Sequence, residues 1–175
     1  LGAVSISASA LGKVLGQKTT VARERIAIAL PKPLKFLAKP PADPALKIPG
    51  LSPFFTPNKD FYRIDTALSV PNISADDWSL EIVGMVANPL TFTYAQLSAR
   101  PVFELDDTIA CVSNEVGGPL VGNARWLGVR LDDLIREAQP TPDADQIMGY
   151  SYDGFTAGFP LATLDGRDAM IAIGM

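Results

Sequence analysis

The chain has no histidine and a single cysteine, Cys111, among its 175 residues. Without histidine, it cannot build a Cys–His nucleophile, a His-ligated zinc site or histidine acid–base catalysis from its own residues. One cysteine cannot form a disulfide within the chain, so cysteine usage does not assign a compartment. Any chemistry must therefore depend on Cys111, on carboxylates, Arg, Lys or Tyr, or on a bound cofactor.

The chain also has no long basic run interleaved with aromatic residues. It carries 19 acidic and 15 basic residues, a net charge of −4. Nucleic acid is therefore not expected as a partner. With 47% hydrophobic residues, the chain is able to bury a core, and we expect one folded domain with irregular ends.

The N-terminal residues 1–16 are small and apolar, with no charge before Lys13. Because a spanning helix needs about 20 apolar residues, this segment is too short to cross a membrane alone. We predict that residues 1–30 are the end of a transmembrane helix and its juxtamembrane segment, which makes the protein membrane-associated; an ordinary terminal helix is the alternative. Basic residues follow the apolar segment and favour a cytoplasmic exit: Lys13, Lys18, Arg23 and Arg25.

Both ends of the sequence suggest a piece of a longer protein. Leu1 is not an initiator methionine, and the chain stops within the apolar run "AMIAIGM". Residues 31–57 contain eight prolines, which exclude a regular helix or a central strand. We predict a linker or a strap lying over the domain, and embedded apolar residues favour the strap: Leu34, Phe36, Leu37, Phe54 and Phe55.

The folded domain is predicted over residues 58–175. Apolar patterns predict strands over residues 61–70, 78–84, 88–93, 102–110, 145–154 and 168–175. Thr93 and Gln96 form a capping box before a short helix that Pro101 ends. An amphipathic helix is expected within "RWLGVRLDDLIREAQP", and a helical turn within "LATLDG". Because residues 78–93 suggest a hairpin, we predict an α+β fold with mixed, largely antiparallel sheets and short helices.

Cys111 lies at the end of a predicted strand, in "TIACVSNEVGG". Glycines after it allow backbone N–H groups to approach a ligand, and Ser113 and Asn114 supply neutral hydrogen-bonding groups. These residues alone leave two interpretations open. Cys111 is either a buried structural cysteine beside a turn or a thiolate ligand for a soft metal.

Four motifs occur in order along residues 55–175: "FYRIDTAL", "TIACVSNEVGG", "GNARWLGVRLDDLI" and "YSYDGFTAGFPL". Together they resemble the molybdopterin-binding oxidoreductase domain of the sulfite oxidase family, and most of all its membrane-linked bacterial branch. The resemblance implies that family's fold and a molybdenum-molybdopterin cofactor. It also implies oxygen-atom and two-electron transfer on a small substrate such as sulfite or a sulfoxide, and a haem or quinone-linked membrane partner for electron transfer.

The resemblance assigns roles to four residues. It implies that Cys111 binds molybdenum through its thiolate, and that Tyr62 and Ser151 contact the cofactor. Arg63 is close to the position of an arginine that faces the oxyanion substrate, although the spacing to "SVP" differs by two residues; a surface or ion-paired arginine is the alternative. Asn114 and Asn123 are expected to support turns, and Trp126 to pack beneath the Cys111 turn.

The resemblance also implies that residues binding the pterin phosphate come later than Met175, so this piece is expected to hold the cofactor poorly. Two other functions stay open. One is a cofactor-free binding module with the same fold, and the other is a redox-sensing thiol at Cys111. For a free thiol, the carboxylates of Asp106, Asp107 and Glu115 would raise the pKa of Cys111 if they lay nearby.

Overall fold

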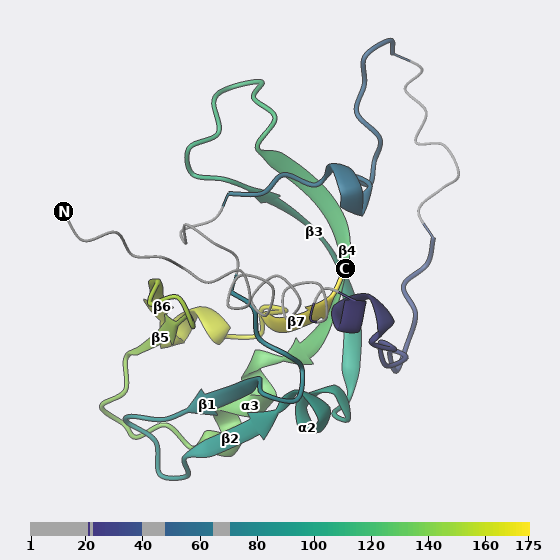
Figure 1. Ribbon diagram of the computed structural model, residues 1–175. Coiled ribbons are helices and arrows are strands. Elements are labelled where there is room, and N and C mark those ends of the chain that lie inside the picture. Colours follow the sequence, from purple (N-terminus) through teal and green to yellow (C-terminus); the bar gives the residue numbers. More distant parts are fainter. Residues whose placement is uncertain (1–20, 22, 40–47, 65–70) are drawn as a thin grey trace, which may run out of the picture.

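A computed structural model describes residues 21, 23–39, 48–64 and 71–175. Within these residues the strands form antiparallel sheets in the orders β1–β2, β3–β4–β7 and β5–β6 (Figure 1). The strands are β1 (Ser79–Ile82), β2 (Leu90–Thr93), β3 (Val102–Ala110), β4 (Val121–Arg130), β5 (Gln146–Tyr150), β6 (Thr156–Pro160) and β7 (Met170–Gly174). The helices are α2 (Tyr94–Ser98) and α3 (Leu131–Ala138), with single turns η1 (Asn58–Asp60) and η2 (Leu161–Leu164). The predicted α+β fold with antiparallel sheets and short helices is confirmed.

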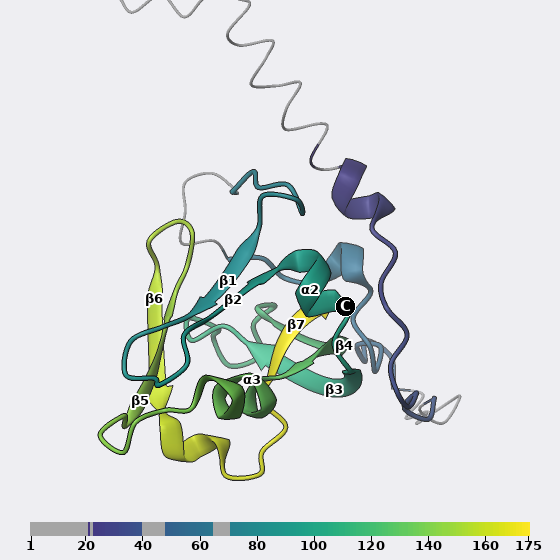
Figure 2. The same cartoon turned by 90° about the horizontal axis from the view of Figure 1, so that it is seen from below.

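The hydrophobic core lies between the β1–β2 hairpin, helices α2 and α3, and one end of the β3–β4–β7 sheet (Figure 2). Its buried members are Phe92, Leu97, Val102, Val129 and Leu134. The short helix α2 begins where it was predicted to begin. Thr93 accepts from the backbone N–H of Gln96, and the Gln96 side chain accepts from the backbone N–H of Thr93, which completes the capping box.

Strands β3 and β4 form a long hairpin that carries Cys111 away from this core. The register runs from Val102↔Val129 to Ala110↔Val121. Val102 is buried, whereas β3 becomes exposed toward Ala110. Strand β7 pairs with β4 over Leu127–Arg130 only. The loop end of the hairpin therefore depends on contacts from outside the core.

Two stretches of the proline-rich segment, residues 34–38 and 54–56, contact the hairpin from outside the core, and we call them the strap. The first stretch begins at the core end of β3, and the second lies nearer the loop end. Leu34 donates its N–H to the carbonyl of Val102 at the outer edge of β3, over 3.0 Å. Thr56 donates to the carbonyl of Asn123 at the outer edge of β4, over 2.9 Å. The strap thus covers both edges of the hairpin, where unpaired backbone groups would otherwise be exposed.

Three predictions of secondary structure need correction. Strand β4 was missed, because "GNARWLGV" was taken as part of a turn and a helix; the helix begins only at Leu131. Strand β6 was also missed. Residues 61–64 do not form the predicted strand, and the remainder of that prediction, residues 65–70, lies outside the described residues.

The predicted membrane segment, residues 1–16, also lies outside the described residues. Among the residues that the structure does describe, no helix is long and apolar enough to cross a membrane.

Candidate functional site

Cys111 directly follows β3 and begins a tightly bonded loop. Its N–H donates to the carbonyl of Leu120 over 2.9 Å, and its carbonyl accepts from the N–H of Asn114 over 2.9 Å. The side-chain oxygen of Asn114 accepts from the N–H of Leu120 over 2.8 Å. A Cβ on Gly118 would lie 2.6 Å from that same oxygen, so only glycine fits there. Asn114 therefore shapes the loop, as predicted.

The Cys111 thiol is partly exposed, and its sulfur lies 3.1 Å from the hydroxyl oxygen of Ser113. This hydrogen bond, followed by backbone N–H groups at Ser113 and Val112, lowers the pKa of Cys111 below its ordinary value because each stabilises the thiolate. The expected raising of the pKa by Asp106, Asp107 and Glu115 is not found. The loop therefore favours the thiolate form of Cys111 more than water does.

An aromatic pair lies on the same hairpin. The ring of Phe61 lies over Gly122, where an added Cβ would approach ring carbons to 2.5 Å. Phe61 meets Trp126 edge-to-face, with ring centroids 5.8 Å apart. Tyr62 stacks on Phe61 at 5.4 Å, with an interplanar angle of 22°. The chain thus leaves the strap, passes through η1 and places the Phe61 ring against β4, with Tyr62 stacked on that ring.

Strand alternation puts this pair on the Cys111 side of the sheet. Ile109 pairs with Gly122, and paired residues project from the same face. Cys111 follows Ile109 by two residues and keeps the ladder bond to Leu120, so it continues that face. The structure therefore places Phe61, with Tyr62 stacked on it, on the face of the hairpin that Cys111 continues.

The other predicted site residues are placed differently. Arg63 follows Tyr62 and is exposed. Ser151 is exposed in the turn between β5 and β6, which belongs to another sheet. Its N–H donates to the carbonyl of Phe155, and the Asp153 carboxylate accepts from the N–H of Phe155. Asp153 thus takes part in the turn.

Asn123 and Trp126 support the hairpin. The Asn123 side chain donates to the carbonyl of Phe54 over 2.7 Å and accepts from the hydroxyl of Thr108 over 3.2 Å. The Trp126 indole N–H donates to the carbonyl of Asp107 over 3.3 Å. Trp126 therefore packs on Phe61 and β3 rather than beneath the Cys111 turn.

Phe61 and Thr56, which pack on the hairpin that carries Cys111, were given no role of their own from the sequence, and the contact of Ser113 with the Cys111 sulfur was not foreseen. Phe61 and Thr56 take their positions from pairing across the chain, which spacing alone does not reveal. Ser113 had a local signal, because a hydroxyl two residues after a cysteine is able to reach its sulfur in a turn.

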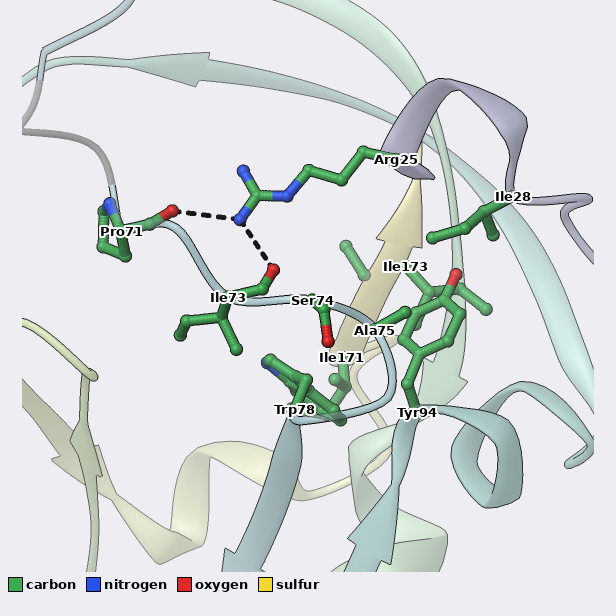
Figure 3. A pocket seen from close by; sticks show the side chains of 11 residues that line it. Arg25, Ile28, Pro71, Ile73, Ser74, Ala75, Trp78, Tyr94, Ile171 and Ile173 are labelled. Atoms are coloured by element: carbon green, nitrogen blue, oxygen red, sulfur yellow. Dashed lines mark hydrogen bonds between the residues drawn. The ribbon is translucent and has the colours of Figure 1, made fainter. Parts of the chain in front are cut away.

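A separate cavity of about 420 Å³ lies between the helical residues 23–27, the loop before β1, and β7 (Figure 3). Its wall is mainly apolar and includes Trp78, Ile171 and Ile173. Arg25 crosses one side and donates to the carbonyls of Pro71 and Ile73 over 3.0 and 3.2 Å. Tyr62, Arg63, Cys111 and Ser151 do not line this cavity.

The described residues hold no group of three or more His, Cys, Asp or Glu side chains that could bind a metal ion. Within them, a metal at Cys111 would thus have one protein sulfur donor and would need its other ligands from a cofactor. A thiolate is the donor type that suits a metal already held by sulfur.

Comparison with known proteins identifies the family of this domain. Residues 67–175 match the family described as "Oxidoreductase molybdopterin binding domain". The chain is 36% identical over 104 residues to "Sulfite oxidase, mitochondrial" of Drosophila melanogaster, an alignment that covers 51% of this chain and 18% of that protein. It therefore spans less than a fifth of the length of that curated relative.

The fold resembles the crystal structure of the sulfane dehydrogenase SoxCD from Paracoccus pantotrophus. The TM-score is 0.60 at 24% identity, and the match covers 70% of this chain and 35% of that chain. This likeness confirms the predicted fold. From the family match over residues 67–175, the chain belongs to the molybdopterin-binding oxidoreductase domains of the sulfite oxidase family.

Proposed function

We propose that the chain is part of a molybdenum-cofactor oxidoreductase in which the Cys111 thiolate binds molybdenum. The observation that carries the proposal is a partly exposed thiol of lowered pKa, held at the loop end of the β3–β4 hairpin on the face that carries Phe61 and Tyr62. Val112 and Val116, on either side of Ser113, are fully exposed apolar side chains. They would shield a cofactor bound beside Cys111 from water.

The bound cofactor would supply the oxygen-atom transfer and accept or donate two electrons. The chain's residues would bind and orient it. Tyr62 would contact the pterin near the metal, Arg63 would face an anionic substrate, and Ser151 would bring a hydroxyl from the β5–β6 turn. The pterin phosphate would be bound by cationic residues of the longer protein, because phosphate recognition favours charge-assisted bonds.

The substrate proposed is sulfite or a sulfoxide. Sulfite and water give sulfate, two protons and two electrons; a sulfoxide, two protons and two electrons give a sulfide and water. The names of the two relatives, a sulfite oxidase and a sulfane dehydrogenase, favour a sulfur compound. Electrons would pass to or from a haem or quinone-linked partner at the bacterial membrane.

The test uses the full-length protein, produced in a host that makes the cofactor. Wild type is expected to contain molybdenum, and X-ray absorption at the molybdenum edge is expected to count one more sulfur ligand than in Cys111→Ser. Val83→Ser, on an exposed residue of the β1–β2 connection, is the control. Absence of molybdenum from wild type, or an unchanged sulfur count in Cys111→Ser, would refute the proposal.

A redox-sensing thiol is the second candidate, and the lowered pKa of Cys111 together with its exposure favours it. It predicts a protein without molybdenum whose Cys111 is reversibly oxidised by hydrogen peroxide to a sulfenic acid. A dimedone adduct at Cys111 in metal-free wild type, prevented by prior alkylation, would support this candidate. A molybdenum-loaded protein with no adduct would exclude it.

A further inference from the structure

The loop end of the β3–β4 hairpin is wrapped by the chain on both faces. One face carries Asn123 and Arg125, whose side chains contact the strap at Phe54, Leu37 and Ala38. The opposite face carries Gly122 and Trp126, which contact Phe61. The segment that follows the strap passes the loop end of the hairpin, as the blue trace in Figure 1 shows.

The chain passes from the strap side of the hairpin to the Phe61 side after Thr56, which is hydrogen-bonded to the edge of β4. Its N–H donates to the carbonyl of Asn123, and its hydroxyl accepts from the N–H of Asn123 over 3.2 Å. Asn123 thus uses its backbone and its side chain to bind residues 54–56. Phe61, five residues after Thr56, packs on the opposite face of the hairpin. The position of its ring therefore depends on where that face has space for it.

The space for the Phe61 ring is at Gly122, which has no side chain. A methyl group at residue 122 would lie 2.5 to 2.9 Å from three carbons of the Phe61 ring, closer than atoms pack. The ring contacts this hollow and meets Trp126 edge-to-face, and Tyr62 stacks on it. Moving Phe61 off the sheet must therefore move Tyr62.

We propose that Gly122 is a positioning residue: by admitting the Phe61 ring to the sheet, it sets the position of Tyr62 on the face of the hairpin that Cys111 continues, where Tyr62 would contact the cofactor. The inference rests on the proposed function, because it concerns how the cofactor is held. Gly122 is covered by the Phe61 ring, so its role toward the cofactor would be indirect. It acts through Phe61, and Asn123 secures the segment that delivers both rings.

The experiment compares wild type, Gly122→Ala, Gly122→Ala/Phe61→Leu and Gly149→Ala in the full-length protein. Gly149 is the matched control, a strand glycine whose added Cβ would lie at an ordinary 3.4 Å from the carbonyl of Ala157. Thermal unfolding, the rate of molybdenum loss to a chelator, and the Mo(V) electron paramagnetic resonance spectrum are measured for each.

Gly122→Ala is expected to unfold at a lower temperature and to change the Mo(V) spectrum. It should also lose molybdenum roughly 2- to 12-fold faster, which is the range expected for the loss of one aromatic contact. The double variant is expected to regain thermal stability, because leucine leaves space for the methyl group. It should still lose molybdenum quickly, because leucine cannot stack on Tyr62.

Recovery of both stability and molybdenum retention in the double variant would overturn the inference, since Gly122 would then serve stability alone. Wild-type retention and spectrum in Gly122→Ala would overturn it too. Failure of the proposed function is a different result, a wild type without molybdenum. In that case, near-ultraviolet circular dichroism of the metal-free protein tests whether Gly122 sets the position of Phe61 and Tyr62. An aromatic signal that is unchanged in Gly122→Ala would overturn the inference.

Discussion

Arg125 joins the strap to the β3–β4 hairpin, and its removal should release the strap. The guanidinium binds the carboxylate of Asp106 through two nitrogens, at 2.7 and 2.8 Å. It also donates to the carbonyls of Leu37 and Ala38 over 3.2 and 2.9 Å, and lies over the ring of Phe55 at 5.6 Å. One side chain therefore contacts both stretches of the strap.

The expected cost of Arg125→Ala follows from these contacts. The side chains of Arg125 and Asp106 are 23% and 31% exposed, so water partly replaces the ion pair and its loss costs only about 0.5–1 kcal/mol. Two carbonyl bonds add about 1 kcal/mol each, and the ring contact about 0.5 kcal/mol. The free energy of unfolding should thus fall by about 3 kcal/mol. Arg125→Lys should lose roughly half of this, because lysine keeps the charge but not the two-nitrogen geometry.

Urea unfolding of the chain measures this loss, and Arg136→Ala is the matched control. Arg136 pairs with Asp133 at 3.0 Å, with side chains 73% and 50% exposed, so its removal should cost under about 0.5 kcal/mol. A lysine-specific protease gives a local readout, because Lys35 and Lys39 flank the Arg125 contacts, and Arg125→Ala should speed cleavage there. If Arg125→Ala is no less stable than Arg136→Ala, or if cleavage at these lysines is unchanged, Arg125 does not hold the strap.

Two further predictions concern local hydrogen bonds. Thr93→Ala removes the oxygen that accepts from Gln96 at the start of α2, so the free energy of unfolding should fall by about 1 kcal/mol, whereas Thr93→Ser should retain most of it; equal stability of both variants would contradict the capping role. Ser113→Ala removes the hydroxyl that stabilises the Cys111 thiolate, so the pKa of Cys111 should rise. The pH midpoint of iodoacetamide alkylation of the metal-free protein should then move upward, and an unchanged midpoint would assign the lowered pKa to another group.

Local sequence signals predicted the elements whose partners lie nearby. The capping box at Thr93 and the apolar spacing of α3 are set within a few residues, and both occur as expected. Strand β4 was missed although Asn123 and Arg125 alternate with Gly122, Ala124 and Trp126, because this stretch was taken as the continuation of the glycine-rich turn and the start of the next helix. Asn123 and Arg125 occupy one face, but they contact the strap rather than water, so both faces are covered. Strand β6 gave no signal because all of its residues are exposed.

The candidate site shows the same limit at the level of function. The position of Cys111 at the end of its strand was predicted from local sequence, but its role as a metal ligand came only from the resemblance to a family, because the residues alone left a structural cysteine equally open. The position of Tyr62 was not predicted, because Phe61 and Tyr62 were both assigned to a strand. Phe61 and Tyr62 take their position because Gly122 has no side chain. The Phe61 ring, which is 61 residues earlier in the sequence, packs in the space that a side chain would fill. A hollow of this kind becomes visible only when the register of β3 and β4 places Gly122 beside Ile109, and thereby beside Cys111.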